Sequence, residues 1–256
     1  MSPKISIAII TYNEEQNIRR TLESVRWADE IVVVDSGSTD KTVEICQEYT
    51  DKIIYQEWLG FSSQKNLAID NAKGEWVLSL DADEPVEPEL SDEIRRIVVS
   101  PESCDGYRIP RKTYFLNKQI RHGGWYPDYN LRLFRKGKGR FEKRAVHEAI
   151  KVDGRIGTAK HALLHYAYPD LAAYMTSINK YSSLSVKVME EKGIIRAKAG
   201  WINIIFRPFA SFILKYFCRL GFLDGKAGLV LNIFHSYYVF AKYAKAWEHL
   251  EKSGGH

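Results

Sequence analysis

Residues 5–15, ISIAIITYNEE, join a continuous apolar run to a polar and acidic end. The apolar part, residues 5–10, is typical of a buried β-strand. The two glutamates that follow open a helical pattern in which Ile18, Leu22 and Val25 share one face. This stretch therefore predicts a strand that leads directly into an amphipathic helix.

The strand and helix unit recurs along the first hundred residues. Apolar strand-like segments are expected at residues 31–34, 52–56 and 76–80, and helical patterns at residues 43–49 and 62–71. This alternation predicts an α/β fold with a Rossmann-like, mostly parallel sheet flanked by helices. In such a sheet, ligands bind in a crevice outside the carboxyl ends of the strands.

Polar side chains stand at three of these predicted strand ends. Thr11 and Asn13 follow the first strand, Asp35 follows the second, and Asp81 and Asp83 follow the fourth. Residues two apart in an extended segment face the same side, so the carboxylates of Asp81 and Asp83 can address one cation. Carboxylate oxygens suit Mg²⁺ or Mn²⁺ and leave positions open for phosphate. For any one of these residues taken singly, ordinary loop polarity is the alternative interpretation.

Charge is distributed unevenly along the 256 residues. Residues 1–100 hold 10 Lys and Arg against 20 Asp and Glu, whereas residues 101–256 hold 27 against 12. The acidic part agrees with a site that needs a cation, and the basic part agrees with a polyanionic partner or an anionic surface.

The three cysteines are far apart in the sequence, so we expect a reducing compartment. The sequence has no secretory leader pattern and no long uninterrupted apolar run, so we expect neither secretion nor a transmembrane span.

Four segments in the chain resemble the successive signatures of family 2 glycosyltransferases, which have a GT-A-type fold. They are IITYNE at residues 9–14, VVDSGSTDKT at 33–42, QKNLA at 64–68 and LDADE at 80–84. Three further segments resemble the subgroup of lipopolysaccharide core biosynthesis: WYP at residues 125–127, RLFR at 132–135 and VHE at 146–148. The resemblance implies an inverting transfer of a hexose, glucose first, from a UDP-linked nucleotide sugar to a lipid-linked saccharide such as the lipopolysaccharide inner core.

The resemblance assigns the nucleoside part of the donor to residues that follow the first two strands. Thr11, Tyr12 and Glu14 would line the pocket for the uracil and the ribose, with the Tyr12 ring available for stacking. Asp35 would bind the base or the ribose. These four residues are the predicted nucleoside site.

The resemblance also assigns the diphosphate and the metal. Lys65 would reach the diphosphate as a point charge, Asp81 would contact the ribose, and Asp83 would hold Mg²⁺ or Mn²⁺, with His147 as a further metal candidate. The metal acts as a Lewis acid that stabilises the departing nucleoside diphosphate. Without the resemblance, a solvated lysine on a helix is an equally good interpretation of Lys65. A hydrogen-bonded structural histidine is an equally good interpretation of His147.

An inverting transfer needs a general base that takes the proton of the acceptor hydroxyl. Glu148 is the first candidate, because it follows the region that would cross the acceptor side of the cleft, and Asp128 is the second. Sequence leaves the choice between the two open, since the geometry that decides it is not visible there.

A basic run between these two candidates has two interpretations. It comprises Arg132, Arg135, Lys136, Lys138, Arg140, Lys143 and Arg144. Such a run usually forms a solvated face, and an anionic glycolipid acceptor gives it a second role, the attraction of negative charge to the cleft.

The C-terminal part is aromatic and basic. Residues 201–256 hold 7 Lys and Arg against 3 Asp and Glu, and apolar residues recur there at helical spacing. Pro208 is expected to divide the first helical stretch in two, with a turn at residues 221–225 before the next helix. We expect the helices to lie in a membrane interface, and the alternative is that they pack on the catalytic domain or on a second subunit.

We therefore expect a GT-A-type catalytic domain at residues 1–165, with a nucleotide-sugar half at 1–100 and an acceptor half at 101–165, and a helical extension at 166–256. The expected partners are a nucleotide-sugar donor, a lipid-linked saccharide acceptor, an anionic membrane surface and a second copy of the chain, but no nucleic acid. The expected location is peripheral, on the cytoplasmic face of a bacterial inner membrane. Two alternatives remain: a sugar-nucleotide-forming nucleotidyltransferase, disfavoured because no glycine-rich phosphate loop follows the first strand, and a non-catalytic polyanion- or membrane-binding protein.

Overall fold

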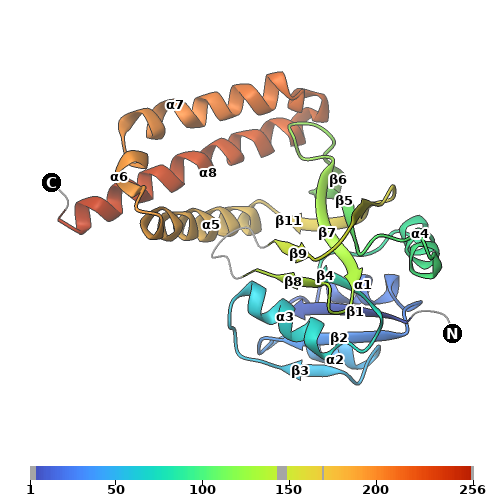
Figure 1. Cartoon of the computed structure of the whole chain (residues 1–256). Helices are drawn as coiled ribbons and strands as arrows, with labels where there is room; N and C mark the ends of the chain where they lie inside the picture. The colour runs from blue at the N-terminus through green and yellow to red at the C-terminus, as the bar shows by residue number, and fades with distance from the viewer. Residues whose placement is uncertain (1–3, 143–148, 169, 255–256) are drawn as a thin grey trace. The chain divides into compact units, whose positions relative to one another are not determined.

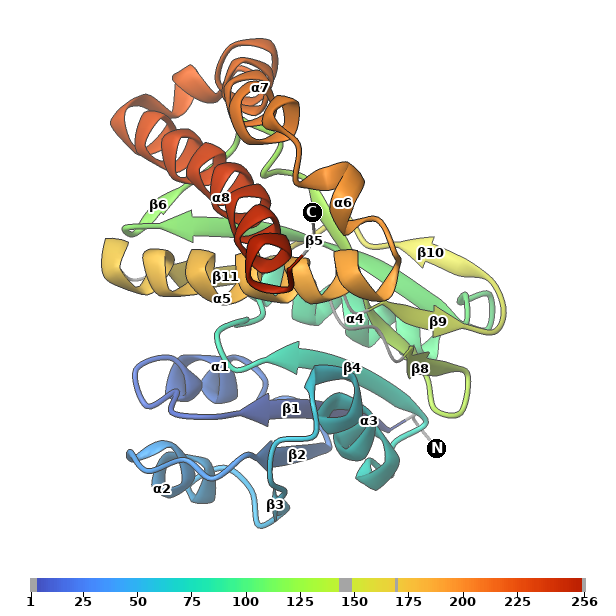
Figure 2. The same ribbon diagram turned by 90° about the vertical axis from the view of Figure 1, so that its left-hand side faces the viewer.

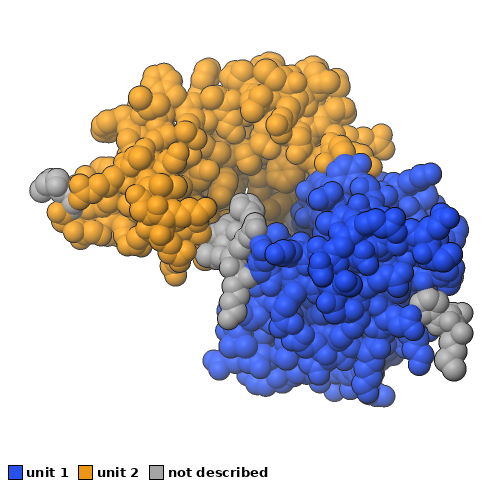
Figure 3. Space-filling view, in the orientation of Figure 1, with its two compact units in different colours: residues 1–112, 128–166 blue, residues 113–127, 167–256 orange. Residues whose placement is uncertain are grey.

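The computed structural model describes residues 4–142, 149–168 and 170–254. The chain forms two compact units, which Figure 3 shows in different colours: unit 1 comprises Met1–Lys112 and Asp128–Tyr166, and unit 2 comprises Thr113–Pro127 and Ala167–His256. The first boundary between the units falls inside strand β5 (Gly106–Phe115). Residues 113–127, which the sequence analysis placed in the acceptor half, therefore group with the C-terminal helices.

The N-terminal part of unit 1 is the predicted parallel sheet (Figure 1). Its strands are β1 (Ile5–Thr11), β2 (Glu30–Asp35), β3 (Ile53–Tyr55) and β4 (Trp76–Asp81). The connecting helices are α1 (Ile18–Ser24), α2 (Thr42–Gln47) and α3 (Phe61–Asn71). Pairing is parallel between β1 and β2, β1 and β4, and β2 and β3. The predicted α/β class is confirmed.

The remaining strands of unit 1 extend this sheet beyond β4 (Figure 2). They are β7 (Asp128–Arg135), β5, β10 (Ile156–Thr158) and β11 (Leu163–Tyr168). The sheet order is β10-β5-β7-β4-β1-β2-β3, β11 also pairs with β5, and β7 runs antiparallel to both of its neighbours. Helix α4 (Pro88–Val99) and the small antiparallel pair of β8 (Gly139–Phe141) and β9 (Ile150–Val152) complete the unit.

Two apolar layers hold the sheet, one on each face. Along β1, Ile7 and Ile9 point into a core shared with α1 and α4, whereas Ala8 and Ile10 point into a core shared with α3. The alternation follows from the strand geometry, in which successive side chains face opposite sides. Because helices cover both faces of the sheet, nearly all residues of the strand are apolar in the sequence.

The basic run that begins at Arg132 is not a uniformly solvated face. Arg132 is buried, the Arg135 guanidinium lies 4.5 Å from the ring centre of Trp76, and the Lys136 ammonium donates to the Ile69 carbonyl at the end of α3, at 2.6 Å. A cation at a helix C-terminus satisfies carbonyls that have no partner within the helix. These three side chains therefore stabilise the fold of unit 1.

Unit 2 is mainly helical, as the predicted C-terminal extension requires. Its helices are α5 (Leu171–Glu191), α6 (Ile195–Lys198), α7 (Trp201–Phe212), the π-helical η1 (Ile213–Cys218), the 3₁₀-helical η2 (Gly221–Asp224) and α8 (Gly225–Lys252). The short strand β6 (Lys118–Gln119) pairs with the end of β5. Phe115 and Ile120 from this segment pack on Tyr174, Ile178 and Leu231 of the helices.

The expectation that Pro208 divides the helix is wrong. Helix α7 continues through Pro208, and the irregular turn follows later, in η1. A proline removes one backbone hydrogen bond from a helix and often bends it, but the surrounding turns can still hold the helix together. The predicted turn at residues 221–225 is present as η2, with Leu220 and Gly225 at positive φ on either side.

Candidate active site

The strand register brings the predicted polar ends to one edge of the sheet. Thr11 at the end of β1 is opposite Asp35 at the end of β2, and Ile10 is opposite Asp81 at the end of β4. Thr11, Asp35 and Asp81 therefore stand side by side at the carboxyl edge. In an open α/β sheet this edge is where ligands bind.

The segment after β1 is fixed to the loop after β2 by its asparagine. Asn13 has a φ of 54°, a left-handed conformation that Asn tolerates better than most residues. Its side-chain oxygen accepts a hydrogen bond from the Thr39 backbone N–H at 2.8 Å, and its own N–H donates to Ser38 Oγ. The two loops thereby hold Tyr12 with its ring 56% exposed, free to stack on a planar ligand.

Asp35 is engaged by its own turn. Its Oδ2 accepts hydrogen bonds from the N–H groups of Gly37 and Ser38 at 2.8 and 2.9 Å, and its Oδ1 accepts one from Ser38 Oγ at 2.5 Å. This carboxylate therefore shapes the loop at the end of β2. Its predicted contact with the base or the ribose stays a prediction.

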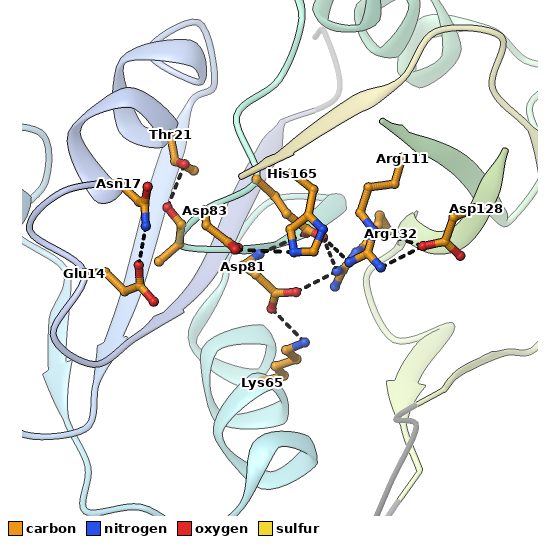
Figure 4. Close-up of polar contacts among 12 residues, drawn as sticks. Glu14, Asn17, Thr21, Lys65, Asp81, Asp83, Arg111, Asp128, Arg132 and His165 are labelled. Carbon is orange, nitrogen blue, oxygen red and sulfur yellow. Dashed lines mark hydrogen bonds and ion pairs between the residues drawn. The ribbon is translucent and has the colours of Figure 1, made fainter. Parts of the chain in front are cut away.

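Asp81 lies between two cations (Figure 4). Lys65 Nζ on α3 is 2.8 Å from Asp81 Oδ1, and Arg132 Nη2 on β7 is 2.7 Å from Asp81 Oδ2. Burial by itself would raise the pKa of Asp81, but the charges of Arg132 and Lys65 outweigh it and hold the pKa well below its usual range. Lys65 is only 6% exposed, so its interpretation as a solvated helix lysine is wrong.

A line of alternating charges continues from Arg132 across unit 1. Arg132 Nη2 and Arg111 Nη1 both donate to Oε1 of Glu84, at 2.6 and 3.0 Å, and Arg111 also donates to Asp128 Oδ2 at 2.7 Å. Glu84 is fully buried and its Oε2 accepts the backbone N–H of Asp81. Buried charges persist only when they are paired in this way.

Asp83 pairs with a histidine that sequence reasoning missed. His165 on β11 places its Nε2 at 3.3 Å from Asp83 Oδ2, while its Nδ1 is buried without a hydrogen-bond partner in the described chain. Burial acts to raise the pKa of Asp83, but the electrostatic interaction and the hydrogen bond with His165 lower the pKa below the usual value. The only sequence feature that could have pointed to His165 is weak: it is a histidine within the largely apolar segment Leu163–Tyr168.

Glu14 lies at the same edge and carries no cationic partner in the described residues (Figure 4). Its Oε2 accepts a hydrogen bond from Asn17 at 2.9 Å. Burial, together with repulsion from Asp83 and Asp81, raises the pKa of Glu14 to about 7, despite the hydrogen bond from Asn17. The carboxyl groups of Glu14, Asp81 and Asp83 therefore lie close enough to repel one another, and a cation bound beside them would relieve this repulsion.

The donor set at this edge suits a divalent cation. Asp83 and His165 supply an oxygen and a nitrogen side by side, but they are only two ligands, since the described residues contain no group of three or more His, Cys, Asp or Glu that could hold a metal. A cation at this pair would take its other ligands from water and from the substrate phosphates. Mg²⁺ is usually held by one or two protein carboxylates together with substrate phosphates, and Mn²⁺ also accepts imidazole. His147 and Glu148 lie outside the described residues, so the structure does not place these predicted metal and base candidates.

The fold and this edge define a GT-A-type α/β protein whose carboxylates and cations meet at the ends of parallel strands. A model of the family described as Glycosyl transferase family 2 matches residues 6–158 of the chain. The chain belongs to this family and is a glycosyltransferase. The family resemblance seen in the four N-terminal motifs is thereby confirmed.

Individual relatives agree with this assignment along nearly the whole chain. The lipopolysaccharide core biosynthesis glycosyltransferase LpsC of Rhizobium meliloti (strain 1021) is 30% identical, over 97% of this chain and 94% of its own. An uncharacterized glycosyltransferase of Rickettsia felis (strain ATCC VR-1525 / URRWXCal2) is 31% identical, over 98% of this chain and 92% of its own.

A solved structure supports the fold. The mannosyltransferase PcManGT from Pyrobaculum calidifontis, in complex with GDP-Man and Mn²⁺, superposes with a TM-score of 0.53 at 16% identity and covers 100% of this chain and 89% of its own. The predicted GT-A-type fold is confirmed by this likeness.

Proposed function

We propose that this glycosyltransferase moves a hexose, glucose first, from a UDP-linked sugar to a lipid-linked saccharide such as the lipopolysaccharide inner core, with inversion at the anomeric carbon. The observation that carries the proposal is the pairing of Asp83 with His165 beside the Lys65–Asp81 ion pair, all at the carboxyl edge of the sheet. The end-to-end similarity to LpsC supports the choice of acceptor.

The chain's own residues divide the work on the donor. Tyr12 stacks on the base, and Lys65 holds the diphosphate while Asp81 keeps its ammonium in place. Asp83 and His165 hold Mg²⁺ or Mn²⁺, which supplies Lewis-acid stabilisation of the departing diphosphate when bound. Because Lys65 and Asp81 are already ordered, the side chains need little rearrangement when the donor arrives.

The acceptor hydroxyl needs a base on the opposite side of the anomeric carbon from the leaving diphosphate. Glu148 takes this role in our proposal, because Asp128 is already engaged by two hydrogen bonds from Arg111, at 2.7 and 3.1 Å. A carboxylate oxygen held by a guanidinium is less available to take a proton. Asp128 is instead a positioning residue at the end of the charged line.

The acceptor places the enzyme at a membrane surface. A saccharide that is attached to lipid A or to a similar anchor stays in the bilayer, so the transferase works at the cytoplasmic face of the bacterial inner membrane in this proposal. The sequence similarity to LpsC and the basic C-terminal residues support this location.

A donor screen tests the proposal. The full chain is incubated with inner-core lipopolysaccharide and, in turn, UDP-glucose, UDP-galactose, UDP-N-acetylglucosamine, GDP-mannose or ADP-heptose, with Mn²⁺, with Mg²⁺ or with a chelator. We expect acceptor-dependent release of UDP from UDP-glucose that stops with the chelator, and a product whose new linkage is inverted by NMR. Release with none of these donors, or a retained anomeric configuration, would contradict the proposal.

A further inference from the structure

Helix α7 leaves a continuous apolar surface uncovered in unit 2. Five of its side chains, each more than half exposed, form one stripe along the helix: Trp201, Ile202, Ile205, Phe206 and Phe209. On its other side α7 packs through Ile204 on a core that includes Val239 of α8. The helix is thus apolar on both its packed and its free side, which is unusual for a helix that faces water.

A second exposed stripe lies on α8, which runs beside α7 in both views (Figures 1 and 2). It consists of Leu229, Ile233, Tyr237, Phe240 and Trp247. A shallow groove of about 490 Å³ opens between the two helices, and its walls include Ile205, Phe209, Tyr237 and Phe240. The two stripes therefore flank one groove, and together they are called the docking face below.

The segment that contains α7 carries positive charge, whereas α8 also has two exposed acids after Trp247, Glu248 and Glu251. The segment Lys192–Lys226 contains seven Lys and Arg residues and one acid, Asp224. Asp224 is only 4% exposed, and its carboxylate accepts hydrogen bonds from the backbone N–H groups of Arg121 and His122. The charge that this segment shows to solvent is therefore entirely positive.

The length of α7 limits how it can meet a bilayer. Its 12 residues span about 18 Å, whereas the hydrocarbon core of a bilayer is about 30 Å thick. Within the described part of the chain, no helix is both long enough and apolar enough to cross a membrane. A short helix with exposed aromatic rings and flanking cations fits the plane of the membrane interface.

We infer that the docking face binds the surface of a bilayer that contains anionic lipids, with α7 at headgroup depth and an acyl chain in the groove between α7 and α8. A second copy of the chain is a poorer occupant, because two basic segments that contain α7 would meet, whereas anionic headgroups complement the charge of this segment. This inference deepens the membrane location of the proposed function, on which it rests, but its test uses neither donor nor acceptor.

Co-sedimentation with vesicles tests the inference. The full chain is mixed with vesicles of phosphatidylcholine that contain about 30% phosphatidylglycerol, or with phosphatidylcholine alone, and binding is expected to be at least about tenfold tighter to the anionic vesicles. The double variant Phe206→Ser/Phe209→Ser should bind about 10- to 100-fold more weakly, since it removes two rings from the interface. The matched control is Leu59→Ser/Val99→Ser, which changes two equally exposed residues of unit 1 and should bind as the parent does.

Tryptophan fluorescence gives a second readout. Trp201 is 75% exposed on α7 and Trp58 is 46% exposed on unit 1. Trp247, 49% exposed on α8, is the second tryptophan of the docking face. Anionic vesicles should shift the emission to shorter wavelength, and Trp201→Phe/Trp247→Phe should remove most of that shift while Trp58→Phe retains it. A shift that survives in Trp201→Phe/Trp247→Phe would overturn the inference.

Two further outcomes would also overturn it. One is equal sedimentation of the two double variants. The other is a dimer of the parent chain, seen by light scattering, that Phe206→Ser/Phe209→Ser converts to a monomer while neither protein binds vesicles. A transferase assay that fails with every donor would leave the vesicle result standing, so failure of the proposed function and failure of this inference are distinguishable.

Discussion

Arg132 and Glu84 form a buried ion pair, with Nη2 of the arginine 2.6 Å from Oε1 of the glutamate, and each of them also contacts Asp81. The pair therefore fixes the carboxylate at the end of β4 from two directions, through the Asp81 side chain and through its backbone N–H. Asp81, which is predicted to contact the donor, is therefore held in one geometry before a substrate arrives.

Removal of the glutamate should destabilise unit 1. Glu84→Gln leaves two guanidinium groups, those of Arg111 and Arg132, without their shared anion, and we expect the free energy of unfolding to fall by about 3–5 kcal/mol. Urea unfolding followed by circular dichroism measures this. The control is Glu48→Gln, which breaks an exposed ion pair with Arg19 and should cost far less stability. Equal losses in the two variants would contradict the assigned role of the buried pair.

Loss of either metal ligand of the proposed function should impair turnover without unfolding the protein. Asp83→Asn and His165→Gln are each expected to lower kcat by about 10²-fold or more, because each removes a donor for the cation that stabilises the leaving diphosphate. Nucleoside diphosphate release as a function of Mn²⁺ concentration measures it, with the thermal unfolding midpoint as a check on folding. Asp92→Asn, an exposed change on α4, is the matched control. Unchanged Mn²⁺ dependence in both variants would remove the proposed metal site.

Substitution of the two candidate bases, Glu148 and Asp128, should lower kcat by very different factors. We expect Glu148→Gln to lower kcat by about 10³-fold or more and to flatten the acidic limb of the pH–rate profile, because it removes the group that takes the acceptor proton. Asp128→Asn keeps the volume of a side chain whose Oδ2 is already occupied by Arg111, and should lower kcat by about tenfold or less. The reverse order of losses would assign the proton transfer to Asp128.

Acid should weaken unit 2 through His235 on α8. Burial, with smaller contributions from the charges of Lys215 and Lys242, lowers the pKa of His235 to about 3. In an unfolded chain the pKa of histidine is about 6.5, so the unfolded state binds this proton first as the pH falls, and the stability present above pH 6.5 is progressively lost. This single group should lower the free energy of unfolding by up to about 2 kcal/mol between pH 7 and pH 5.

Urea unfolding at pH 7 and at pH 5 checks the role of His235. His235→Gln should lose that part of the pH dependence, even if its own stability at pH 7 is lower. His249→Gln changes a more exposed histidine on the same helix, which pairs with Glu190 at 3.0 Å, and serves as the control. A His235→Gln variant that is as acid-sensitive as the parent would show that another group is responsible.

The parallel part of the sheet could be predicted from the sequence because its signals are local. The apolar run at residues 5–10 became β1 and the run at residues 76–80 became β4, each one residue longer than expected. In a parallel sheet the carboxyl ends of all strands lie at one edge, so the sequence also predicted that Asp35 and Asp81 lie at the same edge. Their individual roles stay predictions.

The cationic side of the site could not be predicted, because it depends on contacts between distant segments. Arg132 reaches Asp81 only because β7 pairs antiparallel with β4, in a register that sets Leu133 opposite Leu78. Nothing local distinguishes Arg132 from the basic residues that follow it. His165 has the same origin, since it reaches Asp83 from a strand at the far end of the unit 1 chain.

The boundary inside β5 has a practical consequence for anyone who wishes to dissect the molecule. Phe115 and Ile120 are buried in a cluster with Tyr174, Ile178 and Leu231, so a chain cut after unit 1 would expose both side chains to water. Such a fragment would be prone to aggregate, and a loss of vesicle binding by it would be uninformative. The two units are therefore better separated by single-residue substitution than by truncation.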